Sequence, residues 1–68
     1  MKVLGFTVTP EVEADCFKRM RSGWFCATNI ADIAAKAGVP WAIDYRVADR
    51  LIQRERQAGN IKRYGKGW

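Results

Sequence analysis

Apolar residues recur with a helical period in three separate stretches of the chain. In the first, residues 9–22, Val12, Cys16 and Met20 follow one another every fourth position. Because a helix turns by about 100° per residue, this spacing places the three side chains on one face, with Phe17 at its edge. The pattern predicts an amphipathic first helix that packs this face on a core.

The ends of this stretch carry helix-boundary signals. Thr9 suits the N-cap, and Pro10 suits the first helical position, where its missing N–H costs nothing. Glu11 and Glu13 favour the N-terminal end of the helix dipole, and Gly23 is a suitable terminator. Basic residues near the other end favour the C-terminal end of the dipole: Lys18, Arg19 and Arg21.

The second stretch predicts a helix over residues 29–37. Either Thr28 or Asn29 can cap it, and Asn29 with Asp32 three residues later resembles a capping box. Gly38 ends the helix, since the residue after a helix commonly takes a left-handed conformation. One face carries the apolar positions Ile30, Ile33, Ala34 and Ala37.

The third stretch predicts a longer helix over residues 41–58, between Pro40 and Gly59. Its apolar arc contains Ile43, Val47, Leu51 and Ala58, with Ala48 and Ile52 beside it. The opposite side is basic and rich in amides: Arg46, Arg50, Gln53, Arg54 and Gln57. The helix therefore has one face for a core and another for a partner.

Short β segments are predicted outside the helices. Residues 1–8 are apolar and β-branched, which indicates a strand or an arm lying on the core. The aromatic run at 24–28 indicates a short strand. Residues 60–68 contain a Gly-Lys-Gly turn at 65–67, which indicates a small hairpin. The expected fold is mainly α with a small β-hairpin, in one domain over residues 1–68.

Charge is distributed unevenly along the 68 residues. Up to Tyr45, five basic residues are balanced by five acidic ones. From Arg46 onward there are seven basic residues and two acidic ones, so the net charge of +5 belongs to the last third. Such a segment suits a polyanion, although a solvated helix face has the same composition.

Several classes of protein are disfavoured by residue content. Histidine is absent and Ser22 is the only serine, so the usual general base and an activated nucleophile are missing, and no enzyme is expected. Cys16 and Cys26 are too few for a zinc site, and we expect buried thiols rather than a disulfide. No cofactor or small-molecule ligand is indicated. The absence of a signal peptide and of an apolar run near 20 residues predicts a cytoplasmic protein without a membrane partner.

The segment "IADIAAKAGVP", residues 30–40, connects the second and third helices. A small residue at Ala34 allows two helices to cross closely, and Gly38 allows a tight turn between them. The segment resembles bacterial helix-turn-helix families. With "AGNIKRYGKGW" at the C-terminal end, the chain from Thr9 to Trp68 is most similar to the winged-helix superfamily, in which a short β-hairpin wing follows three helices.

This resemblance implies double-stranded DNA as the partner, with helix 41–58 in the major groove and the wing at 60–68 on the backbone or minor groove. Arg46 or Arg50 would read guanine and Gln53 adenine, because their hydrogen-bonding groups match those base edges. The full set of implied DNA-binding residues is Trp41, Tyr45, Arg46, Asp49, Arg50, Gln53, Arg54, Lys62, Arg63 and Lys66.

Some of these residues have a plain structural alternative. Trp41 caps the core if it does not touch DNA. Arg54 and Arg56 are only solvated, or pair with Glu55 or Asp49, if they do not reach a phosphate. Asp44 and Glu55 stand where the superfamily commonly has apolar residues, which leaves open which side of the third helix faces outward.

The expected function is that of a small transcriptional regulator or a phage-type architectural factor. The alternative is a winged-helix module that binds an acidic protein partner. A homodimer is compatible with either function. The apolar segment at 3–8 and the pair Trp24 and Phe25 are candidate dimer surfaces, although core packing explains them equally well.

Overall fold

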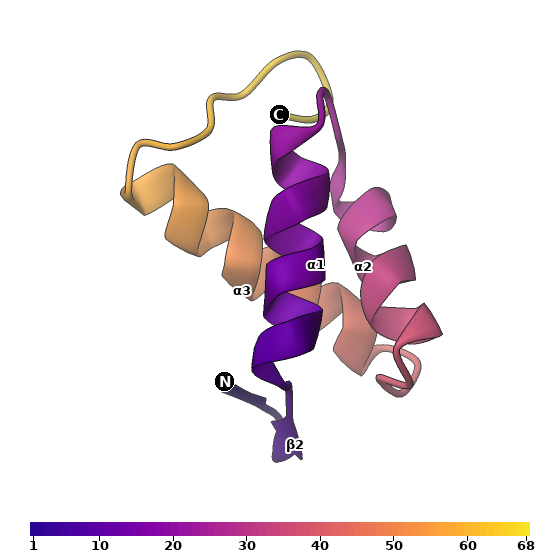
Figure 1. The fold of residues 1–68 in the computed structure, drawn as a ribbon. Helices are drawn as coiled ribbons and strands as arrows, with labels where there is room; N and C mark the ends of the chain where they lie inside the picture. Colours follow the sequence, from indigo (N-terminus) through magenta and orange to yellow (C-terminus); the bar gives the residue numbers. More distant parts are fainter.

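The computed structural model describes all 68 residues and consists of a small hairpin followed by three helices (Figure 1). Two short strands come first, β1 at Lys2–Val3 and β2 at Phe6–Thr7. The helices are α1 at Pro10–Arg21, α2 at Ala27–Lys36 and α3 at Ile43–Gln57. The mainly helical fold with three helices is the one that the sequence predicts, but its small antiparallel hairpin lies at residues 2–7 instead of 60–68. Helices α1 and α2 pack side by side, and α3 crosses behind them.

The only regular hairpin lies at the N-terminus, where a single strand or arm was expected. Val3 pairs with Phe6 across a two-residue turn. Both turn residues, Leu4 and Gly5, have positive φ angles, of 50° and 81°. This is the backbone of the tight hairpin turns whose twist matches that of the strands. The buried side chains of Val3 and Val8 attach the hairpin to the core.

Helix α1 has the predicted caps and the predicted face. The backbone N–H of Val12 donates to Thr9 Oγ1 at 3.4 Å, and Pro10 occupies the first turn. Cys16 and Met20 are buried. Val12 is partly buried and packs on the same core, so the four-residue spacing identifies the buried face correctly.

Helix α2 begins two residues before the predicted start. Its N-cap is Cys26, and the backbone N–H of Cys26 donates to Asn29 Oδ1 at 2.9 Å. The predicted cap at Thr28 or Asn29 is therefore wrong: Asn29 is the third residue of the helix and reaches back to Cys26. Asp32 instead pairs with Lys36 at 3.2 Å. The early start also removes the strand predicted at 24–28, whose last two residues are helical.

Helix α3 begins at Ile43 rather than at 41 or 42, and it ends at Gln57. The carbonyl oxygen of Pro40 accepts hydrogen bonds from the N–H groups of Ile43 and Asp44, at 3.1 and 3.2 Å. Pro40 thus lies in a turn that leads into the helix. Gly38, with φ of 98°, makes the preceding bend, as predicted.

The buried side of α3 is rotated from the predicted arc. Asp44 and Glu55 are buried, whereas Ala58 is exposed. These two acids lie on the same side as the apolar residues Val47, Ala48, Leu51 and Ile52. Each acid has a local hydrogen bond: Asp44 Oδ1 accepts from the N–H of Tyr45 at 2.7 Å, and Glu55 accepts from the side-chain amide of Asn60.

The C-terminal segment does not form the predicted two-stranded hairpin. It contains one isolated bridge, between Tyr64 and Gly67. Its end pairs instead with the segment between α1 and α2. The N–H of Phe25 donates to the carbonyl of Trp68 at 3.0 Å, and the N–H of Trp68 donates back at 2.8 Å. The 24–28 segment and the end of the chain are thus neighbours without being regular strands.

The core consists of thirteen buried apolar residues contributed by the hairpin and all three helices. Phe25, Ile30 and Leu51 are among its largest fully buried side chains. Ala34, in α2, is also fully buried, as expected of a small residue at a helix crossing. None of the helices combines the length and the apolar character required to cross a bilayer.

Candidate nucleic-acid interface

The outward side of α3 is polar and mainly basic. Arg46, Asp49, Arg50, Gln53 and Gln57 are all exposed on it. They occupy successive turns because residues three and four apart share one side of a helix. Asp49 is the only acid among them. The exposed side predicted for this helix is therefore present, despite the rotation of its buried side.

A shallow hollow runs along this side of α3, with a volume of about 340 Å³. Its walls combine guanidinium and amide groups with the side chain of Met1. Such groups donate and accept hydrogen bonds in fixed planar geometries, which is the chemistry that reads base edges or phosphates. The lining residues are Met1, Asp49, Arg50, Gln53, Arg54 and Gln57.

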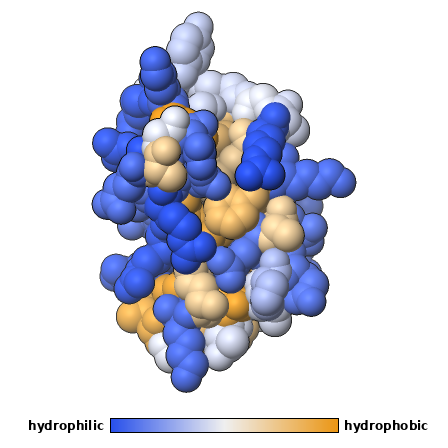
Figure 2. Space-filling view, turned by 60° about the vertical axis from the view of Figure 1, so that its left-hand side comes forward, coloured by the Kyte–Doolittle hydropathy of each residue, from blue (hydrophilic) through white to orange (hydrophobic).

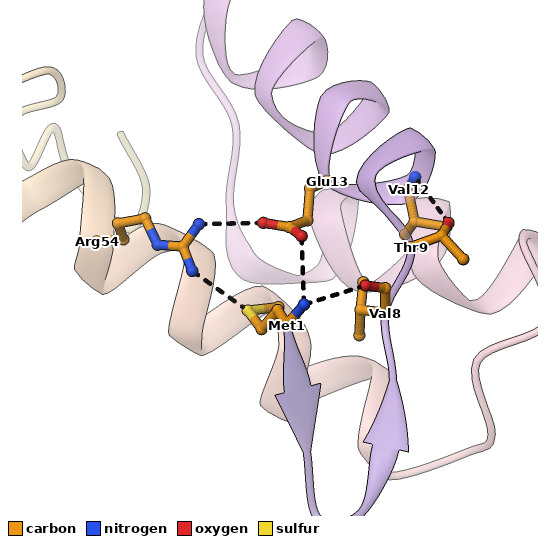
Figure 3. A network of polar contacts seen from close by, with 6 residues as sticks. All are labelled: Met1, Val8, Thr9, Val12, Glu13 and Arg54. Carbon is orange, nitrogen blue, oxygen red and sulfur yellow. Dashed lines mark hydrogen bonds and ion pairs between the residues drawn. The ribbon is translucent and has the colours of Figure 1, made fainter.

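Arg54 differs from the other arginines because it is held by α1 (Figure 3). Its Nη1 donates to Glu13 Oε1 at 3.0 Å, and its Nη2 lies 3.6 Å from the sulfur of Met1. The same carboxylate lies 3.6 Å from the terminal ammonium of Met1. Arg54 therefore joins α3 to α1 and the hairpin. The sequence offered an ion pair with Glu55 or Asp49 as one alternative for Arg54; an ion pair is present, but its partner is Glu13, so the predicted partners are wrong.

Arg46 and Arg50 are not engaged in this way. Three ion pairs exist in the structure, and they involve Met1 with Glu13, Lys36 with Asp32, and Arg54 with Glu13. Neither Arg46 nor Arg50 takes part in an ion pair or a side-chain hydrogen bond. Both guanidinium groups are available to an incoming anion.

Two aromatic residues stand at the start of α3. The side chain of Trp41 is 89 % exposed and that of Tyr45 is 49 % exposed. Trp41 does not cap the core, which answers one of the alternatives left by the sequence. Trp41 lies in the turn that precedes α3, and Tyr45 lies in the first turn of that helix.

The basic residues of the C-terminal segment are placed differently from one another. Lys62 and Lys66 are exposed and form no ion pair. The guanidinium of Arg63 lies 5.0 Å from the centre of the Trp68 ring, and its Nε donates to the carbonyl of Gly65 at 3.1 Å. Arg63 therefore helps to hold this segment together, while the two lysines are free.

Two aromatic contacts attach the C-terminal segment to the helices. The Trp68 ring stacks on Phe25 with 5.9 Å between centroids, and Trp24 Nε1 donates to the carbonyl of Tyr64 at 2.9 Å. Gly67 is buried beside them. A Cβ on Gly67 would overlap the Phe25 carbonyl oxygen and approach the Trp24 ring to 2.7 Å. Trp68 thus packs this segment against the helices.

The two groups of predicted DNA-binding residues lie at different ends of the molecule. In Figure 1 the turn between α2 and α3 is at the lower right, whereas the C-terminal segment crosses above the end of α1. Lys62 and Lys66 are therefore not gathered around Trp41 and Tyr45. A ligand that touches both groups must extend along the molecule, whose longest dimension is 30 Å.

A second hollow, of about 280 Å³, lies between α1, the end of α3 and the residues that follow it. Phe17, Met20 and Ile61 supply its apolar lining, and polar groups complete it: Arg21, Glu55 and Asn60. Figure 2 shows apolar surface in the middle of one face of the molecule, framed by polar side chains.

Sequence reasoning missed Met1 and Glu13, and it placed Gln57 on the polar side of the third helix without including it among the DNA-binding residues. The helical period places Gln57 on the polar side, so that signal was present. The contacts of Met1 and Glu13 with Arg54 join residues 53 and 41 positions apart, and no local pattern indicates them.

No family model matches the chain, and neither a curated protein nor a solved structure matches it. The proposal below therefore depends on the residues and their geometry alone.

Proposed function

We propose that this protein binds double-stranded DNA by placing the outward side of α3 in the major groove. The observation that carries the proposal is the pair Arg46 and Arg50, exposed on adjacent turns and free of internal partners. Gln53 and Gln57 continue the same side of the helix. An α-helix fits the major groove, and these side chains match what that groove presents.

Each residue type has a distinct task in this proposal. Arg46 and Arg50 donate paired hydrogen bonds to guanine or single ones to phosphate. Gln53 pairs its amide with adenine. Arg54, which α1 holds, fixes the orientation of the helix and is left out of the contact set that the sequence implied.

The arrangement of the segments supports a winged-helix fold for the proposal. After the N-terminal hairpin, the chain order is α1, an extended segment, α2, a tight turn, α3 and a final turn that folds back. The reciprocal backbone hydrogen bonds between Phe25 and Trp68 join the extended segment to the final turn. In the proposed complex Lys62 and Lys66 contact the DNA backbone beyond the groove that α3 occupies. Such a protein would serve as a transcriptional regulator or a phage-type architectural factor.

The experiment compares two double variants in binding to duplex DNA. Arg46→Ala with Arg50→Ala removes two charges from the proposed interface. Each loss should weaken binding by about 1–3 kcal/mol if the residue contacts a base edge. Lys18→Ala with Arg21→Ala removes the same charge from exposed positions of α1 and serves as the control.

The control variant should bind much more tightly than the interface variant at the same ionic strength. Equal affinities would mean that only net charge matters, and the assignment of the α3 side would then be wrong. Unfolding curves of both variants establish that each remains folded.

A further inference from the structure

Trp41 is the most exposed large apolar residue of the chain and has no internal partner. Its side chain is 89 % exposed, against 51 % for Trp24. Trp24 uses its indole N–H in a hydrogen bond, and Trp68 stacks on Phe25, whereas the Trp41 ring takes part in no such contact. Core packing therefore does not explain why a tryptophan occupies this position.

The backbone beside Trp41 holds the ring outward. Ala42 has φ of 74° and ψ of −34°, a backbone conformation that residues other than glycine rarely adopt. The carbonyl of Pro40 accepts from the N–H groups of Ile43 and Asp44, which closes the turn around Trp41. Strained backbone of this kind costs free energy and concentrates at functional sites. The turn thus fixes the backbone from which the exposed indole projects.

The surroundings of the ring favour a nucleic acid as its ligand. Arg46 and Arg50 lie further along α3 and are exposed without partners, and Asp49 is the only exposed acid of that helix. Nucleic acids offer flat apolar surfaces next to anionic groups, and aromatic side chains stack on those surfaces. A protein partner would have to combine an acidic surface for the arginines with an apolar pocket for the ring, whereas every nucleotide carries both a phosphate and a flat base.

We propose that Trp41 stacks on a DNA base that is unpaired or unstacked, beside the stretch of duplex bound by α3. In intact B-form duplex both faces of every base are covered by neighbours, and only base edges reach the grooves. The Trp41 ring can stack on a base only where one face of that base is not covered by a neighbouring base. The protein should therefore prefer duplex DNA that contains an unpaired base. This inference depends on the DNA binding proposed above and specifies the ligand of that site.

The test measures binding of the full chain to two short duplexes that differ only by one unpaired bulged base. Wild-type protein should bind the bulged duplex at least about fivefold more tightly, since stacking one base on an aromatic ring contributes a factor of this size or more. Trp41→Ala should lose this preference, and Trp41→Phe should keep most of it. Leu4→Ala, which truncates another exposed apolar residue, should bind both duplexes as the wild type does.

Two further readouts separate stacking from a structural or electrostatic role. Trp41→Ala should keep the thermal midpoint and the salt dependence of the wild type, because the ring is exposed and uncharged. The bulged duplex should quench tryptophan fluorescence in the wild type and not in Trp41→Phe.

The possible failures are distinguishable. Equal wild-type affinity for both duplexes, or a preference that survives in Trp41→Ala, overturns the stacking role and leaves the proposed function intact. If the wild type binds neither duplex at low salt, the stacking role and the proposed function fail together.

Discussion

Arg54 of α3 and Glu13 of α1 form an ion pair with 3.0 Å between Nη1 and Oε1. The two residues are 41 positions apart, and the pair lies at the edge of the polar side of α3. Glu13 is largely buried, whereas the Arg54 side chain is 54 % exposed. This contact helps to set which side of α3 faces outward, and therefore it helps to keep Arg46 and Arg50 exposed.

The ion pair should contribute modestly to stability. In a double-mutant cycle, Arg54→Ala and Glu13→Gln should show a coupling free energy of about 0.2–1 kcal/mol, because solvent screens a half-exposed pair. The pair between Lys36 and Asp32 has both side chains mostly exposed, and its coupling should be smaller. Urea denaturation measures both cycles. A coupling no larger for Arg54 and Glu13 than for the surface pair would show that Arg54 does not anchor α3.

Replacing Gly67 with alanine should disrupt the packing of the C-terminal segment, whereas replacing Gly65 should cost only a little stability. Gly67→Ala brings a Cβ into the Phe25 carbonyl oxygen and the Trp24 ring, so it must separate the C-terminal segment from the helices. Gly65 has φ of 63° and open space around it, and Gly65→Ala should cost about 1 kcal/mol for the left-handed backbone alone. Tryptophan emission should shift strongly to the red in Gly67→Ala only. Similar spectra and similar unfolding midpoints in the two variants would contradict the observed packing.

The buried thiol of Cys16 should make the protein less stable in alkaline solution. Burial, together with the nearby Asp15 and Glu13 carboxylates, raises the pKa of this thiol from 9.0 to about 11. Between these values the unfolded chain loses the proton and the folded protein keeps it. The free energy of unfolding therefore falls as the pH rises from about 9 to about 11, by at most about 1.4 kcal/mol per pH unit.

Cys16→Ala supplies the comparison for that prediction. The variant loses packing, but its stability should fall less steeply with pH over the same range. Urea denaturation at several pH values measures both proteins. Parallel pH profiles would show that Cys16 does not titrate in the unfolding equilibrium.

Because the turn at Ala42 is strained, an alanine-to-glycine substitution there should change stability in the opposite direction from one inside a helix. Ala42→Gly relieves a left-handed conformation and should raise stability by about 0.5–1 kcal/mol. Ala14→Gly, at an exposed position in the middle of α1, should lower it by about 1 kcal/mol. Thermal denaturation distinguishes the signs. A loss of stability in Ala42→Gly would mean that the turn is not strained.

Local patterns predict α1 almost completely. Thr9, Pro10 and the spacing of Cys16 and Met20 all depend on residues within a few positions of one another. The bend at Gly38 is predicted for the same reason. The predicted N-cap of α2 is wrong because Asn29 fits two roles, that of an N-cap and that of the third helical residue in a capping box. In the structure it has the second role, and the box begins at Cys26.

The features that the sequence did not predict depend on distant contacts. The side of α3 that carries Asp44 and Glu55 was left open by the sequence, and its burial follows from the packing of α3 on the rest of the core, since the hydrogen bonds of both acids are local. Phe25 pairs with Trp68 across 43 positions of the chain. The exposed arginines of α3 were predictable from the helical period, whereas the attachment of Arg54 to α1 was not.

The most direct test of the central claim is the affinity of the wild-type chain for random-sequence duplex DNA across salt concentration. We expect binding at low salt that weakens steeply. If the free cations Arg46, Arg50, Lys62 and Lys66 all reach phosphates, log K should fall with log salt with a slope of about −3 to −4. Absence of binding at low salt would contradict the proposal and would favour the alternative, in which the outward side of α3 binds an acidic protein partner.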